Sequence, residues 1–170
     1  INSFAPGANL AVAYTTIMEK SLSFLNVGSL VQFTLNDNDV ESVTLTGNNN
    51  EKISGKVNID YNSGNPIVTA SDIAVTLNHA DGSPLLSGNT YYFIVAPATF
   101  NRGITVTVRK TDGSFATRTT TGSVSFSRNQ FVSLGVIENL LTAKTVAAMT
   151  PQRFFRFSPK EAKISLRGHI

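Results

Sequence analysis

Few residues in this sequence belong to types that perform acid–base or nucleophilic chemistry. Its histidines are His79, close to a predicted loop, and His169, the penultimate residue. A Ser-His-Asp triad requires a base that is oriented by an acid and lies within reach of a nucleophile, and no spacing in the chain marks such a set. Glycine-rich phosphate-binding loops are also absent from the sequence. We therefore predict no catalytic residue and no cofactor, and expect a protein that is not an enzyme.

One short motif resembles a metal site, the Asn-Asp-Asn-Asp run at 36–39. Counted from Asp37, a calcium loop of the EF-hand type needs glycine at its sixth position and an acid at its twelfth, but those positions hold Ser42 and Asn48. The chain has no cysteine, which excludes disulfides and cysteine-based metal sites. We interpret the run as a turn rich in Asn and Asp and expect no bound metal.

Aromatic side chains supply the candidates for ligand binding. A sugar-binding surface usually presents Trp or Tyr, and this chain has no Trp. Because Tyr91 and Tyr92 fall in the middle of an expected strand, at least one of the two rings should lie in the core. The candidate glycan contacts are Tyr14, Tyr61, Tyr91 and Tyr92.

The segment 104–137 is predicted to be a meander of four strands. Apolar and polar residues alternate along it with period two, so each strand has one apolar face. Asp112-Gly113 is typical of a two-residue hairpin turn with positive φ angles. A meander with one apolar face requires a second sheet to cover it. The four strands are expected at 104–109, 115–120, 124–126 and 132–136.

Further short strands precede the meander, separated by turns that contain Asn, Asp, Gly and Pro. Strands recur about every 8 to 12 residues, which is the spacing of a sandwich or barrel. The segment 24–35 is densely apolar, so we expect it at a central position in a sheet. We predict one all-β domain over residues 1–137, a two-sheet antiparallel β-sandwich. The earlier strands are expected at 10–15, 24–35, 40–45, 53–61, 67–69, 73–77 and 90–95.

Charge is sparse and unevenly distributed along the chain. Charged residues make up 15% of the 170 residues, against about 25% in a typical domain. Residues 138–170 hold six Lys and Arg and two Asp and Glu, a net charge of +4, which leaves −1 for the rest of a chain of net charge +3. A nucleic-acid binder carries its basic stripe on the folded domain, so we expect no nucleic-acid partner. No apolar run reaches the ~18 residues of a membrane span, so no transmembrane segment is expected.

Residues 138–170 are predicted to form a basic tail appended to the domain. The segment 139–149 has weak helical character, and Pro151 stops it. We expect the remaining tail to be loose or to act in contacts between chains. The candidate subunit contacts are Phe154, Phe155, Phe157, Ala162, Ile164 and Leu166.

Five stretches agree in order and spacing with a known family. They include the lead-in Ala5-Pro6-Gly7, the Lys110-Thr111-Asp112-Gly113 turn and the closing Phe131-Val132-Ser133-Leu134-Gly135. The most specific is 42–57. On these motifs the chain resembles the fimbrillins of Bacteroidetes, the shaft and tip pilins with their surface-anchored relatives. The five stretches are 4–14, 24–35, 42–57, 91–113 and 128–137.

The resemblance implies a transthyretin-like sandwich that is exported as a lipoprotein to the cell surface, the outer membrane or a fimbrium. It also implies that the first strands of the domain precede Ile1, and that subunits assemble when a strand of one chain fills a groove in the next. The expected partners are other pilin subunits or further copies of this chain, together with a host or bacterial surface ligand. A glycan-binding module on the same scaffold is the alternative function.

Overall fold

The computed structural model describes residues 7–15, 18, 21–60, 66–68, 72–138 and 147–148. All regular elements within these residues are β-strands, so the predicted all-β class is confirmed. The strands are β1 (Ala11–Val12), β2 (Leu25–Asn26), β3 (Ser29–Asn36), β4 (Val40–Gly47), β5 (Val57–Ile59), β6 (Pro66–Val68), β7 (Ala74–Asn78), β8 (Thr90–Val95), β9 (Ala98–Phe100), β10 (Ile104–Lys110), β11 (Phe115–Thr119), β12 (Val124–Phe126), β13 (Phe131–Glu138) and β14 (Ala147–Ala148).

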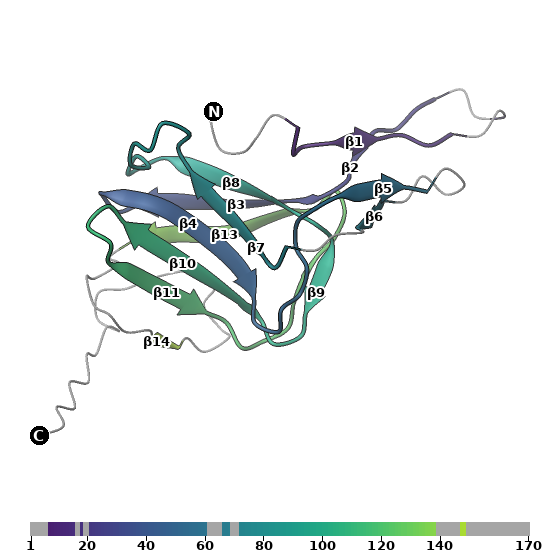
Figure 1. Cartoon of the computed structure of the whole chain (residues 1–170). Coiled ribbons are helices and arrows are strands. Elements are labelled where there is room, and N and C mark those ends of the chain that lie inside the picture. The colour runs from purple at the N-terminus through teal and green to yellow at the C-terminus, as the bar shows by residue number, and fades with distance from the viewer. Residues whose placement is uncertain are drawn as a thin grey trace, which may run out of the picture.

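Two sheets face each other and enclose one core, as predicted for a sandwich (Figure 1). The front sheet has the order β14-β11-β10-β4-β7, and the back sheet has the order β13-β3-β8. Alternate residues of β3, β8 and β10 are buried, because successive side chains of a strand point to opposite faces. The rings of Phe33 and Phe93 stack within the core with their centroids 5.1 Å apart. β3 is the central strand of its sheet, as its apolar sequence indicates.

The predicted four-stranded meander is wrong in its second half. β10 and β11 form the expected antiparallel hairpin. β12, however, pairs with β9, and β13 pairs with β3 in the back sheet, so the chain crosses between layers after β11. Period two assigns the faces of a strand but does not choose its neighbour, which explains the error.

Two of the strand pairs are parallel rather than antiparallel. β13 runs parallel to β3, and the short β14 runs parallel to β11. The register of β13 shifts between Ser133 and Val136, where Gly135 has a φ of 75°. This bulge places one extra residue in β13 and bends the strand.

The turn between β10 and β11 has three residues rather than the predicted two. The Gly113 amide donates to the Lys110 carbonyl at 3.0 Å, and the Lys110 amide donates to the Ser114 carbonyl at 2.8 Å. Of the turn residues, only Gly113 has a positive φ, 84°. A three-residue loop that ends in a left-handed glycine is the next common solution for a hairpin.

The predicted strand 24–35 is divided into β2 and β3. Gly28 lies at the break, where a Cβ would approach the Ile94 side chain and the Val95 carbonyl oxygen to 2.9 Å. Of the predicted weak helix at 139–149, the described residues are Ala147–Ala148, and these form β14 instead. Among the described residues we find no helix long and apolar enough to cross a membrane.

Candidate interaction surface

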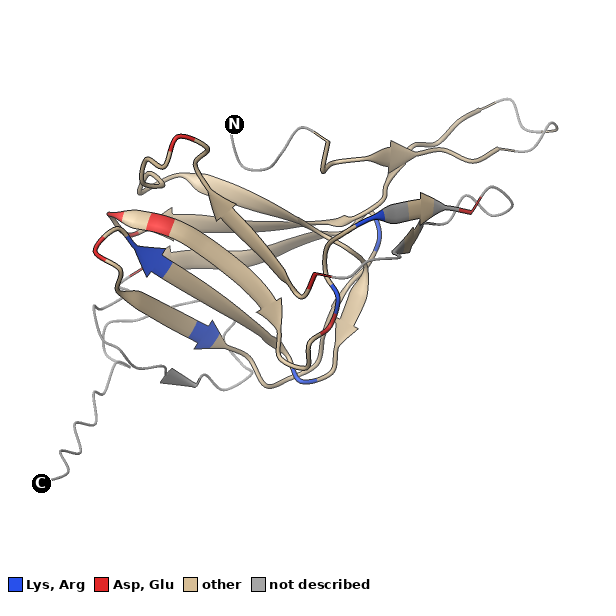
Figure 2. Cartoon of the chain, viewed as in Figure 1, with Lys and Arg blue, Asp and Glu red and all other residues tan. Residues whose placement is uncertain are grey.

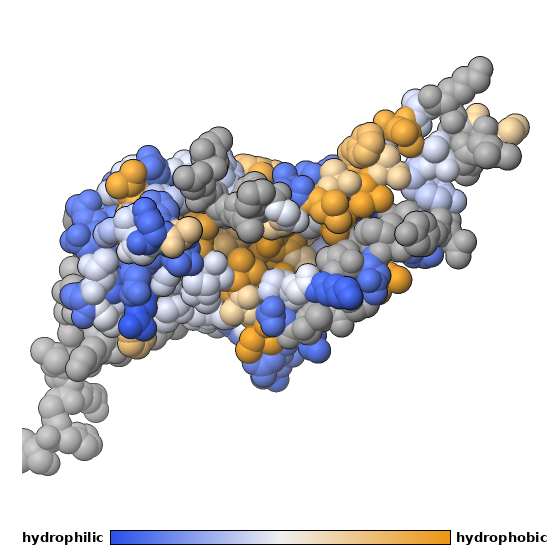
Figure 3. Space-filling view, turned by 45° about the horizontal axis from the view of Figure 1, so that its top comes forward, coloured by the Kyte–Doolittle hydropathy of each residue, from blue (hydrophilic) through white to orange (hydrophobic). Residues whose placement is uncertain are grey.

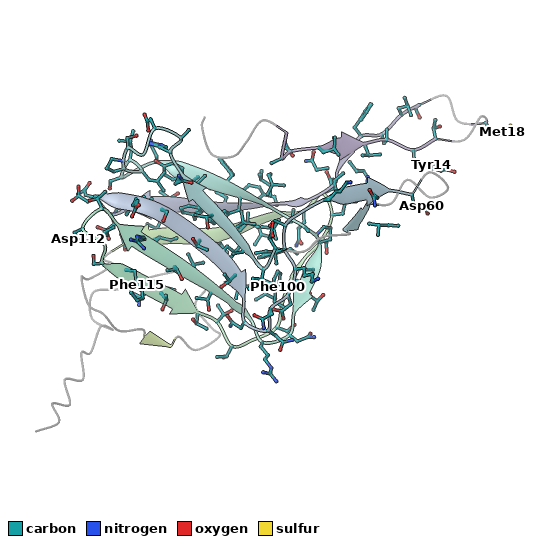
Figure 4. All side chains as sticks on the ribbon, in the orientation of Figure 1. Tyr14, Met18, Asp60, Phe100, Asp112 and Phe115 are labelled. Atoms are coloured by element: carbon teal, nitrogen blue, oxygen red, sulfur yellow. The ribbon has the colours of Figure 1, made fainter. Side chains whose placement is uncertain are left out.

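An arm, made by the described residues 7–15, 18 and 21–26, projects from one corner of the sandwich (Figure 1). β1 and β2 pair with each other in antiparallel register, apart from the two main sheets. The arm is apolar and open to solvent, and Figure 4 shows Tyr14 and Met18 toward its far end. Its exposed apolar side chains, with their exposed fractions, are Leu10 (49%), Tyr14 (48%), Met18 (86%), Leu22 (56%), Phe24 (67%) and Leu25 (41%).

The base of the arm is held by the loop before β13. The Arg128 guanidinium donates to the carbonyls of Asn26 at 3.2 Å and Val12 at 3.3 Å, so one side chain joins both strands of the arm. The Asn26 amide donates to Asn129 Oδ1 at 3.1 Å. The Val27 amide donates to the Leu10 carbonyl at 2.7 Å. These contacts fix the position at which the arm leaves the body.

The outer edge of β8 is open. β8 pairs with β3 so that Leu30 lies opposite Ile94. The Leu30 amide donates to Gln130 on the other side of β3, so Leu30 and Ile94 form a non-hydrogen-bonded pair. The backbone groups of Ile94 and of its alternate neighbours Thr90 and Tyr92 therefore point away from β3. No described residue pairs with them there.

We define the open edge as the outward backbone groups of Thr90, Tyr92 and Ile94. At one end, a hydrogen bond from outside β8 limits it. The Ala96 amide donates to the Ile53 carbonyl at 2.8 Å and closes the edge just beyond β8. The strand itself is Thr-Tyr-Tyr-Phe-Ile-Val, without a charge, a proline or a bulge. Figure 3 shows apolar side chains over the arm and in a hollow beside it. Edges of this kind recruit extended strands.

The tyrosines predicted to contact glycans lie in different environments. Tyr14 is on the arm and is 48% exposed. Tyr92 is half-buried on the outer face of the back sheet. Tyr91 is buried and stacks on Phe33 with centroids 5.8 Å apart, which agrees with the expectation that one ring of the pair belongs to the core. Tyr61 lies outside the described residues, and the structure does not bring Tyr14 and Tyr91 together on one surface.

The six tail residues predicted to contact other subunits also lie outside the described residues. They are Phe154, Phe155, Phe157, Ala162, Ile164 and Leu166.

His79 lies in a small polar cluster on the loop after β7. Its Nδ1 is 2.8 Å from Ser83 Oγ, and that hydroxyl donates to Asp81 Oδ1 at 2.7 Å. The hydrogen bonds from Ser83 lower the pKa of the Asp81 carboxyl. In a catalytic triad the acid orients the histidine, whereas here Asp81 accepts a hydrogen bond from the Ser83 hydroxyl. The geometry is that of a loop held by its own side chains.

Asp37, in the metal-like run, is used as a structural anchor. Its Oδ1 accepts a hydrogen bond from the Asn38 amide at 2.9 Å, as in a turn stabilised by an aspartate. It also accepts from Lys110 Nζ at 3.0 Å, with both side chains largely buried. Asp37 directly follows β3 of the back sheet, and Lys110 ends β10 of the front sheet. The ion pair therefore joins the two sheets at one end. Among the described residues, no three acidic or histidine side chains are grouped to hold a metal ion.

Neither the arm nor the position of the open edge is predicted from the sequence. A signal for the arm was present: Leu22, Phe24 and Leu25 are apolar at both parities, so they cannot all face one core from a single strand. No comparable signal reveals the edge, because the direction of backbone groups depends on which strands become neighbours.

No protein-family model matches the sequence, and a search of curated proteins finds no match. Among solved structures, the fold is similar to the crystal structure of a "putative cell adhesion protein" from Bacteroides ovatus, with a TM-score of 0.46 and 10% sequence identity. The similarity covers 67% of this chain and 41% of that chain, so the present chain spans less than half the length of that protein.

Proposed function

We propose that this chain is a non-enzymatic structural subunit or accessory component of a bacterial fimbria or cell-surface adhesin, and that it joins other subunits by strand pairing. The observation that carries the proposal is the open edge, where Thr90, Tyr92 and Ile94 direct their backbone groups away from β3. The sequence resemblance to fimbrillins over residues 4–137 supports a location at the cell surface, in the outer membrane or in a fimbrium.

An extended strand is the ligand that fits such an edge. Amide donors and carbonyl acceptors alternate along it at the spacing of a strand, and only another extended backbone satisfies them in register. The inward side chains of β8 already belong to the core. A donor with alternating apolar residues would therefore add buried side chains as well as hydrogen bonds. In the tail, Ala162, Ile164 and Leu166 have that alternation.

A charge on the open edge should prevent assembly. In the substitution Ile94→Lys, the half-buried side chain on the edge becomes a cation, which disfavours a second strand beside it. The matched control is Val136→Lys, an exposed apolar residue on β13 at the opposite edge of the same sheet. We expect unboiled gels and negative-stain images of the purified full chain to show ladders or fibres for the control and monomers for Ile94→Lys. Equal assembly by both variants would contradict the proposal.

A second test addresses the donor. Replacing Ile164 with Asp should abolish assembly while the folded monomer keeps its denaturation midpoint. Unchanged assembly would remove the tail as the donor but leave the edge in place, because another segment would then supply the strand.

The alternative function, a glycan-binding module, has one observation in its favour: Tyr14 is about half exposed on a projecting arm. A glycan array probed with Tyr14→Ala and Tyr92→Ala tests it. Loss of a glycan signal with Tyr14→Ala would support the alternative, whereas a scaffold protein has no such signal to lose.

A further inference from the structure

The outer face of the front sheet carries a grid of polar side chains that the proposed assembly does not use. Strand register places two rows of residues side by side across β7, β4, β10 and β11. The first row is Asn78, Ser42, Arg109 and Phe115, and the second is Thr76, Thr44, Thr107 and Thr117. With neighbouring strands about 4.8 Å apart, the grid extends about 14 Å across the sheet.

Phe115 is the unusual member of the grid. It is 50% exposed at the end of its row, on the solvent side of β11, although the core accepts apolar residues from the opposite face of the same strand (Figure 4). Its direct cross-strand neighbour is Arg109. An exposed aromatic ring beside a planar guanidinium and hydroxyl groups is the combination that binds a sugar, because the ring stacks on the apolar face of the pyranose while the polar groups bond its hydroxyls.

The hydroxyls of this grid differ from those at the other end of the same face. There, Thr105 donates to Asn48 Oδ1 at 2.6 Å and contacts Thr119 Oγ1 at 2.8 Å, so those groups are occupied. In the grid, Thr44 Oγ1 and Thr76 Oγ1 share a hydrogen bond at 2.9 Å, whereas the hydroxyls of Ser42, Thr107 and Thr117 make no hydrogen bond to another described residue. Among the described residues of this face, the hydroxyls without a hydrogen bond thus lie in the row of Phe115, at Ser42, and in the next row, at Thr107 and Thr117.

The charge of the grid indicates whether its ligand is neutral or ionic. Arg109 Nε bonds Glu41 Oε2 at 2.9 Å, so the cation is neutralised while its remaining N–H groups stay available. The other members of the grid are uncharged, and Figure 2 shows charged residues of the front sheet toward the ends of its strands. We propose that this grid, centred on Phe115, Arg109 and Thr107, binds a neutral polysaccharide. The proposal does not depend on strand pairing at the open edge.

Affinity gel electrophoresis of the full chain in gels containing dextran, yeast mannan, xylan or galactomannan tests this site, with polygalacturonate as the acidic comparison. We expect a neutral polysaccharide to retard the protein, and Phe115→Ala to weaken its binding about tenfold or more, which corresponds to the loss of one aromatic stacking contact. Phe131→Ala is the matched control, because Phe131 is similarly exposed, at 57%, but begins a strand of the other sheet.

Two further variants refine the test. Thr107→Val keeps the shape of the side chain and removes its hydroxyl, so it should weaken binding less than Phe115→Ala does. Tyr14→Ala should leave binding unchanged, which separates this site from a glycan site on the arm. Retardation by polygalacturonate alone, retardation by none of the polysaccharides, or equal binding by Phe115→Ala and Phe131→Ala would each overturn the proposal.

Discussion

The back sheet ends in two edge strands, β8 and β13, that expose their backbones in different ways. β13 contains a bulge at Gly135, which interrupts the regular spacing of its backbone groups. β8 pairs with β3 over Thr90–Val95 without a register shift and carries no charge. Proteins blunt edges with bulges and charges where pairing must be avoided. The contrast teaches that one side of this sheet is protected from strand addition and the other is suited to it.

The edge with the more exposed apolar side chains is not the edge with the more regular backbone. Of the outward-facing residues, Phe131 and Val136 on β13 are exposed, at 57% and 39%, whereas Tyr92 and Ile94 on β8 are half-buried. Exposed apolar side chains alone would therefore favour β13 as the accepting edge. Our proposal of β8 rests instead on the direction and regularity of its backbone groups.

The largest predicted effect concerns the inward face of β8. Phe93 is 1% exposed and stacks on Phe33, so Phe93→Ala should lower the free energy of unfolding by about 3–5 kcal/mol. Phe131→Ala on β13 should change it by less than about 0.5 kcal/mol. Urea denaturation measures both. Similar values for the two variants would mean that β8 is not integral to the core, and the contrast between the edges would fail.

The second-largest effect concerns the ion pair between Asp37 and Lys110, which holds the end of β3 to the front sheet. β3 lies between the two edge strands. Lys110→Met should cost about 1–3 kcal/mol, because the largely buried Asp37 carboxylate loses its cation. The neighbouring pair Arg109–Glu41 is exposed, so Arg109→Met should cost less than about 1 kcal/mol. If the exposed pair proves the more costly to break, the two sheets are not held together at Asp37.

The third effect tests the bulge of β13. Gly135→Ala places a Cβ on a residue with a φ of 75°, which should cost about 1–2 kcal/mol. Thermal denaturation compared with Val136→Ala, at an exposed position of the same strand, gives the difference. A neutral Gly135→Ala would show that the strand can straighten, and β13 would then be as open to pairing as β8.

The smallest effect lies in the β10–β11 turn, away from both edges. The side-chain and backbone hydrogen bonds from Ser114 lower the pKa of the Asp112 carboxyl below its ordinary value of 3.8. A lowered folded-state pKa means that the carboxylate stabilises the fold above pH 3.8, and that this contribution is lost as the pH falls through the folded-state pKa. NMR titration should show a lowered midpoint that Ser114→Ala moves back toward 3.8. An unmoved midpoint would assign the shift to another group. Assembly should be the same in both proteins.

Most of the strand positions follow from the sequence, because alternation and turn residues depend only on neighbouring positions in the chain. Thr90–Val95 is predicted with its observed bounds, and the β10–β11 hairpin with nearly its observed bounds. β9 is not predicted, since a three-residue strand directly after Pro97 is too short to show alternation. The predicted turn at Gly113 is one residue too short, because Asp-Gly fits both two-residue and three-residue hairpin loops.

The candidate surfaces follow less directly from sequence, for a physical reason. Pairing of β13 with β3 joins residues about a hundred positions apart, and only that pairing decides that Ile94 faces outward at the opposite edge. In the sequence pattern, Phe115 is likewise one more apolar strand residue. Its register with Arg109 is what places it on the polar face.

Amide hydrogen exchange of β8 tests the central claim most directly. In the folded monomer, the amides of Tyr91, Phe93 and Val95 should exchange slowly because they face β3, whereas those of Tyr92 and Ile94 should exchange rapidly. In the assembled protein, Tyr92 and Ile94 should become as protected as their neighbours. Slow exchange of Tyr92 and Ile94 in the monomer, or rapid exchange that persists after assembly, would contradict the account.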